Sequence, residues 1–87
     1  MSTAEKRLWR LYSVPADLRW DELVTALASV GFAENAQKGG SYRKFVNADG
    51  RVIYLHRPHP APYVKRYAIR EVIAMLRELN IVPRETK

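Results

Sequence analysis

Residues 42–56, YRKFVNADGRVIYLH, contain two runs of aromatic and β-branched residues separated by a polar turn. This pattern predicts a β-hairpin, and the length of its loop decides which residues face each other. A two-residue loop would set Phe45 opposite Tyr54. A three-residue loop with Gly50 in the left-handed conformation sets Phe45 opposite Ile53 instead.

We predict the three-residue loop because it gathers the apolar residues Phe45, Ile53 and Leu55 on one face, where a core can bury them. In this register Tyr42 stands directly across from His56. The opposite face of the hairpin then carries Tyr42, Lys44, Val46, Val52, Tyr54 and His56.

The residues on either side of the hairpin predict the other elements. Apolar residues at three- and four-residue spacing indicate helices at 3–12, 20–30 and 65–80, the second of which ends at Gly31. The strands are expected at residues 32–37, 42–47 and 51–57, as an antiparallel meander.

Three prolines in residues 58–64, PHPAPYV, exclude a regular helix or a central strand. This segment is expected to form an ordered turn or an extended crossing segment. The order is therefore helix, helix, three strands, helix. It predicts an α+β fold in which helices cover one face of the sheet.

The composition limits the classes of protein. A chain of 87 residues, 47% of them hydrophobic, suffices for one domain with a modest core. It has no cysteine, which excludes disulfides and thiolate metal sites. No stretch resembles a membrane span or a signal peptide, so we expect a soluble, cytoplasmic protein.

The formal net charge of +6 is concentrated in one part of the chain. Residues 35–70 contain eight basic residues and only one acidic residue, Asp49, a net charge of +7, whereas the remainder carries seven basic and eight acidic residues. A basic segment of this kind favours a polyanion such as nucleic acid. The alternative is a charge excess that serves solubility alone.

Four stretches occur in the order and spacing of a known family. They are WDELVTALASVGF at residues 20–32, GGSYRKF at 39–45, VIYLHRPHP at 52–60 and ELNI at 78–81. Together they resemble the HicA family of small bacterial toxins. The resemblance divides the chain into an N-terminal helical extension (1–18), a HicA-like domain (19–82) and a flexible tail (83–87).

The resemblance implies a two-layer fold of the double-stranded RNA-binding kind. It also implies a toxin that binds messenger RNA and cleaves it with neither a metal ion nor another cofactor. The partner implied by the resemblance is an antitoxin of the HicB family, which holds the toxin inactive.

The family motif in the second stretch contains glycine, serine, histidine, two variable positions and phenylalanine. Gly40, Ser41 and Phe45 match this motif, but Tyr42 occupies the histidine position. An unperturbed tyrosine, with a pKa near 10, is a poor general base at neutral pH, whereas a histidine near 6.5 is well suited. Our hypothesis is that His56, expected across from Tyr42, supplies the missing imidazole, and that Tyr42 hydrogen-bonds the substrate or the imidazole.

Further residues are candidates for contact with RNA. Arg43, Lys44 and Arg57 are expected to stabilise negative charge in the transition state, and a basic pair opens the last helix. The complete set of expected RNA-binding residues is Lys38, Gly40, Ser41, Arg43, Lys44, Arg57, His59, Lys65 and Arg66.

Simpler interpretations stay open beside these. His56 can be a structural residue, and His59 a turn residue or an antitoxin contact. Metal binding by the two histidines is less favoured, because no nearby carboxylate or other third ligand completes a site. Three functions therefore compete: a ribonuclease that uses His56, an RNA-binding protein without nuclease activity, and a protein that only binds its antitoxin.

Overall fold

The computed structural model describes residues 3–36 and 42–83 of the chain. The elements are α1 (Thr3–Tyr12), α2 (Trp20–Ser29), β1 (Ala33–Ala36), β2 (Tyr42–Val46), β3 (Val52–His56) and α3 (Arg66–Glu78). This confirms the predicted α+β order, and each element begins and ends within two residues of its expected bounds. Four residues of the expected tail, 84–87, lie outside the described part.

The hairpin between β2 and β3 has the predicted three-residue loop. Gly50 adopts a φ of 81°, which costs glycine little because it has no Cβ. The Asn47 N–H donates to the Arg51 carbonyl at 3.1 Å, and the Asn47 side-chain oxygen accepts from the Arg51 N–H at 2.8 Å. These bonds close the turn and set Phe45 opposite Ile53.

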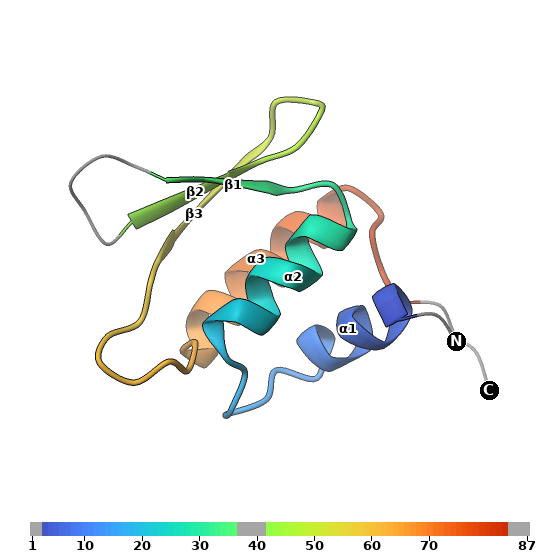
Figure 1. Cartoon of the computed structure of the whole chain (residues 1–87). Helices are drawn as coiled ribbons and strands as arrows, with labels where there is room; N and C mark the ends of the chain where they lie inside the picture. The colour runs from blue at the N-terminus through green and yellow to red at the C-terminus, as the bar shows by residue number, and fades with distance from the viewer. Residues whose placement is uncertain (1–2, 37–41, 84–87) are drawn as a thin grey trace.

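The three strands form an antiparallel sheet in the order β1-β2-β3, and α2 and α3 both lie on one face of it (Figure 1). Phe45 points to these helices, is fully buried, and meets the Trp20 ring edge-on with 5.9 Å between centroids. The core therefore lies between the sheet and the helices. The α3 side chains buried in it are Ile69, Val72, Ile73 and Leu76.

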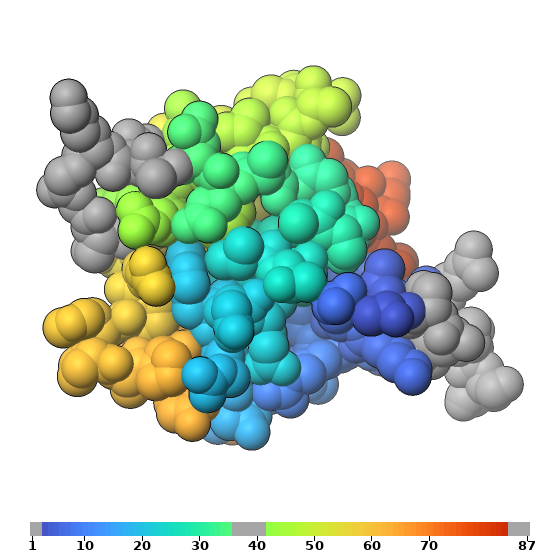
Figure 2. Space-filling model, in the orientation of Figure 1, coloured from blue at the N-terminus to red at the C-terminus, as the bar shows by residue number. Residues whose placement is uncertain are grey.

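The proline-rich connection from β3 to α3 is an ordered crossing segment, as predicted. The Val64 N–H donates to the Leu18 carbonyl at 2.8 Å, and the Trp20 N–H donates to the Pro62 carbonyl at 2.8 Å. Figure 2 shows the connection, in yellow to orange, lying against the chain that leads into α2. These bonds place the start of α3 near the start of α2.

The N-terminal helix α1 packs on the rest of the protein. Leu8 and Leu11 are buried in the same core as the sheet and the other two helices. The Tyr12 hydroxyl donates to the Ile81 carbonyl at 2.6 Å, and the Arg77 guanidinium lies over the Tyr12 ring, 5.7 Å from its centroid. The N-terminal extension therefore contacts both α2 and the C-terminal end of α3.

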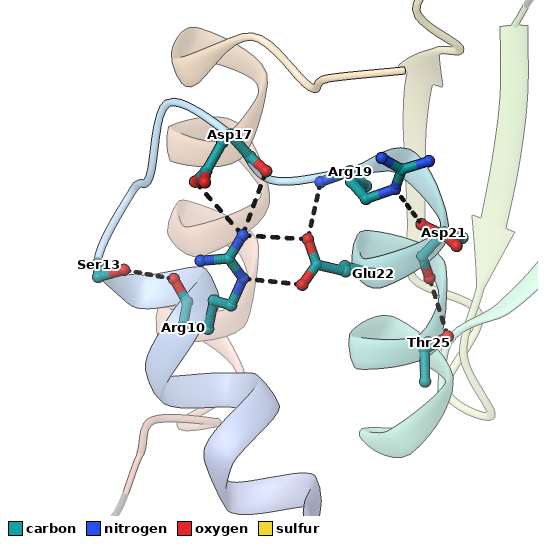
Figure 3. Close-up of polar contacts among 7 residues, drawn as sticks. All are labelled: Arg10, Ser13, Asp17, Arg19, Asp21, Glu22 and Thr25. Carbon is teal, nitrogen blue, oxygen red and sulfur yellow. Dashed lines mark hydrogen bonds and ion pairs between the residues drawn. The ribbon is translucent and has the colours of Figure 1, made fainter.

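An ion pair that the sequence did not predict joins α1 to α2 (Figure 3). The Arg10 Nε donates to Glu22 Oε2 at 2.9 Å and its Nη2 donates to Oε1 at 3.1 Å. Glu22 Oε1 also accepts from the backbone N–H of Arg19, the N-cap of α2, at 2.9 Å. The hydrogen bond from Arg10, followed by the one from Arg19, lowers the pKa of Glu22 below its usual value.

This lowered pKa predicts a pH-dependent contribution to stability. The ionised carboxylate stabilises the fold above the unfolded pKa, near 4.3, and the contribution is lost as the pH falls through the lower, folded pKa. Because the pair is partly exposed and screened, Glu22→Gln should lower the free energy of unfolding by about 0.5–1 kcal/mol at pH 7. Urea denaturation at pH 7, 5 and 3 measures the difference, which should shrink at pH 3.

Glu71→Gln is the matched control, since Glu71 is an exposed helical carboxylate that forms no ion pair within residues 3–36 and 42–83. It should leave the free energy of unfolding nearly unchanged at all three pH values. A deficit for Glu22→Gln that stays constant from pH 7 to pH 3 would contradict the proposed role of the carboxylate charge.

Candidate functional site

The residues at the ends of β2 and β3 form a ring pair on the face of the sheet opposite the helices. Tyr42 is paired with His56 across the two strands, as predicted. Because cross-strand pairs alternate from the hydrogen-bonded pair of Asn47 and Arg51, this is a non-hydrogen-bonded pair, in which side chains approach most closely. The two ring centroids are 3.8 Å apart and the planes are tilted by 36°.

A hollow of ≈ 220 Å³ lies next to this ring pair, between the outer edge of β3 and the beginning of α3. We call it the tyrosine hollow because three exposed tyrosines line it. It has an apolar part, a cation and a carboxylate. Its lining residues are Tyr42, Tyr54, Leu55, His56, Pro58, Val64, Lys65, Tyr67, Ala68 and Glu71.

A second, more open hollow of ≈ 550 Å³ is formed by the proline-rich connection and the start of α3. His59, Lys65 and Arg66 line it, and Lys65 also lines the tyrosine hollow. A ligand that crosses from one hollow to the other would therefore pass Lys65. The arrangement suits an extended anion whose charges are spaced along its length.

The structure separates Arg43 from the other candidate residues. Arg43 lies on the same face of β2 as Phe45, half-buried, and its Nε is 3.3 Å from the Glu34 carboxylate of β1. Lys44, by contrast, projects on the face that carries Tyr42. Arg57, another candidate, is exposed and follows the last residue of β3. The candidates Lys38, Gly40 and Ser41 lie outside the described residues.

Sequence reasoning missed the two side chains of α3 that bring an aromatic ring and a carboxylate to the tyrosine hollow, those of Tyr67 and Glu71. They are four positions apart, so they share one face of the helix, away from the buried stripe. From this spacing, the sequence could have predicted that Tyr67 and Glu71 lie next to each other on α3. Their meeting with β3 depends on the packing of α3 against the sheet, which no local pattern reveals.

The described part of the chain contains neither a group of metal ligands nor a membrane-spanning helix. Among residues 3–36 and 42–83, no three side chains of histidine, aspartate or glutamate are grouped so that they could hold a metal ion. In the same part of the chain, no helix is long and apolar enough to cross a membrane.

The fold is an α+β domain whose helices cover one face of a three-stranded sheet, and whose other face carries an imidazole, exposed tyrosines and a lysine beside a hollow. A comparison with protein families matches residues 20–81 to the HicA toxin of bacterial toxin–antitoxin systems. The chain therefore belongs to the HicA toxin family, and this membership implies an antitoxin partner. Searches of curated proteins and of solved structures returned no match.

The ring contact between Tyr42 and His56 predicts a magnetic effect that can be measured by NMR. Tyr42→Ala should shift the ring-proton resonances of His56, because it removes the ring current of the neighbouring phenol, whereas Tyr42→Phe should largely preserve them. Loss of the cross-strand pair should also lower the free energy of unfolding by about 0.2–1 kcal/mol.

His59 provides the internal control, since these are the only two histidines in the chain. Its resonances should change little in either variant, because it lies on the connection and lines the second hollow. Unchanged His56 resonances in Tyr42→Ala would show that the two rings are not in contact in solution.

Proposed function

We propose that this protein is an RNA-directed toxin that cleaves messenger RNA without a metal ion and is neutralised by a HicB-type antitoxin. The observation that carries the proposal is the position of His56. It is directly across from Tyr42, the position of the family's histidine, and in ring contact with it. The imidazole of His56 on β3 therefore lies on the same surface as the side chain of a histidine at position 42 on β2 would.

Cleavage in this proposal uses the 2′-hydroxyl of the RNA as the nucleophile. His56 accepts the proton of the 2′-hydroxyl as general base, the oxygen attacks the adjacent phosphorus, and the bond from phosphorus to the 5′-oxygen breaks. The products are a 2′,3′-cyclic phosphate and a 5′-hydroxyl, whose proton comes from the solvent that reaches the exposed site. Tyr42 orients the imidazole through the ring contact.

Positive charge around the site supports both binding and catalysis. Lys44 lies two residues from Tyr42 on the same face of β2, and Arg57 is exposed directly after His56. Lys65 lines both hollows, and Arg66 lines the second. These cations would attract the phosphate backbone and stabilise the negative charge that builds up on the phosphorane. Arg43 contributes less in this proposal because its side chain pairs with Glu34.

RNA binding without cleavage is the alternative function. Tyr42 at the family's histidine position favours it, since a phenol is a weak base at neutral pH. The exposed tyrosines of the hollow also favour it, since aromatic side chains stack on unpaired bases without any chemistry. In this alternative the toxin would act by occupying RNA, and the antitoxin would compete for the same surface.

Cleavage assays on His56→Ala test the proposed function. The wild-type protein should cut a labelled RNA in the presence of a chelator, and a DNA copy of the same sequence should stay intact because it has no 2′-hydroxyl. The variant should cleave about 10²- to 10⁴-fold more slowly, the usual contribution of a general base.

His59→Ala is the matched control. It should raise the RNA concentration needed for half-maximal rate while sparing the rate at saturation, because His59 lines the second hollow and not the tyrosine hollow. Undiminished cleavage by His56→Ala would exclude His56 as the base. Salt-sensitive binding with no cleavage by the wild-type protein would support the alternative function.

Salt dependence provides a separate prediction about binding. If Lys44, Arg57, Lys65 and Arg66 neutralise one phosphate each, the logarithm of the affinity for single-stranded RNA should fall against the logarithm of salt concentration with a slope of about −2.8. Lys65→Gln should make this slope shallower by about 0.7. Fluorescence anisotropy between 50 and 300 mM salt measures both slopes, and a slope near zero would contradict contact with phosphates.

A further inference from the structure

The composition of the tyrosine hollow differs from that of a phosphate site. Tyr42, Tyr54 and Tyr67 expose 49%, 55% and 58% of their surface, although they are large aromatic residues. They come from three different elements, β2, β3 and α3, and converge on one hollow. Exposed aromatic rings gathered in this way provide stacking surfaces for planar groups.

The size of the hollow limits its occupant. At ≈ 220 Å³ it is smaller than the roughly 300–1,000 Å³ typical of sites for drug-sized ligands. One planar ring system fits such a volume better than a whole nucleotide or a base pair. Leu55, Val64 and Ala68 supply apolar surface to the hollow, which suits the face of an unstacked base.

Glu71 is the least expected residue in a surface proposed to bind RNA. Its carboxylate would repel a phosphate, yet it lines the hollow together with Lys65 and His56. Within residues 3–36 and 42–83 it forms no ion pair that would neutralise it. A carboxylate accepts hydrogen bonds only, so it suits the edge of a base that presents N–H donors.

The Watson–Crick edge of guanine presents two adjacent N–H donors, N1–H and N2–H, in the spacing that a carboxylate accepts with both oxygens. Adenine and cytosine each present a single amino group beside an acceptor nitrogen. Uracil presents one N–H between two carbonyl oxygens, which the carboxylate repels. Guanine is therefore the base that Glu71 accommodates best.

We propose that the tyrosine hollow binds one unpaired guanine base of single-stranded RNA, which stacks on the exposed tyrosines while Glu71 accepts its N1–H and N2–H. This inference rests on the proposed RNA binding and adds the substrate class and a base preference. The backbone of the same nucleotide then passes Lys65 toward the second hollow. Because His56 lines the tyrosine hollow, the bound guanine fixes which phosphate the imidazole reaches.

Binding to oligonucleotides that cannot be cut tests the inference independently of cleavage. The probes are single-stranded octamers of 2′-fluoro-uridine with one central guanine, adenine, cytosine or uracil, because a 2′-fluorine cannot act as a nucleophile. The wild-type protein should bind the guanine octamer about tenfold more tightly than the uracil octamer, the effect of one specific base contact. Pairing the guanine octamer with a complementary strand should abolish this preference.

Variants of the two α3 residues separate recognition from stacking. Glu71→Gln should bring the guanine and uracil octamers to within about twofold of each other without weakening binding to the uracil octamer. Asp49→Asn, at the exposed hairpin turn, is the matched control for charge and should retain the guanine preference. Tyr67→Ala should weaken binding to the guanine octamer by roughly 5- to 100-fold. Tyr67→Phe should bind this octamer about as tightly as the wild-type protein does, because the stacking ring is kept.

The outcomes distinguish this inference from the proposed function. Equal affinity for the four octamers by a protein that still cleaves RNA would overturn the guanine site and leave the nuclease standing. A guanine preference that depends on Glu71, in a protein that does not cleave, would support the site and overturn the nuclease. A preference that survives in Glu71→Gln would overturn the assigned role of Glu71.

Discussion

The three-residue loop at Gly50 is the constraint on which both the core and the site depend. Side chains alternate between the two faces of a strand, so a shift of one residue would move Phe45 into solvent and bring polar residues to the core. The bonds made by Asn47 and the left-handed Gly50 prevent that shift. The same register places Tyr42 across from His56 on the opposite face, so the packing of the core determines the geometry of the site.

The proline-rich connection adds the second half of the site. The backbone bonds from Val64 to Leu18 and from Trp20 to Pro62 fix where the chain re-enters the helical layer. They bring the first turns of α3 to the outer edge of β3, and a hollow forms where the two meet. The prolines limit the conformations of this segment in the unfolded chain, which lowers the entropic cost of holding it in one place.

The parts of the structure that could be predicted from the sequence depend on local patterns. The turn at Gly50 and the apolar alternation around Phe45 fix the hairpin, and helical spacing fixes the helices. The charge of Arg43 makes it a candidate for the site. However, Arg43 and Phe45 are two positions apart in one strand, so their side chains lie on the same, core-facing side of the sheet. Tyr67 and Glu71 could not be assigned, because they join the site only through the packing of α3 on β3. The ion pair between α1 and α2 was missed for the same reason.

A paired position on two strands describes this site better than a motif on one strand. Directly opposed residues have Cβ atoms about 4.5–5.5 Å apart, and non-hydrogen-bonded pairs are at the close end of that range. Placing the histidine at position 42 and the tyrosine at position 56 would therefore move the imidazole by less than the length of one nucleotide. Both residues border the same hollow. The chemistry of the surface can thus be kept while the residue named by the motif changes, provided that the register of the hairpin is kept as well.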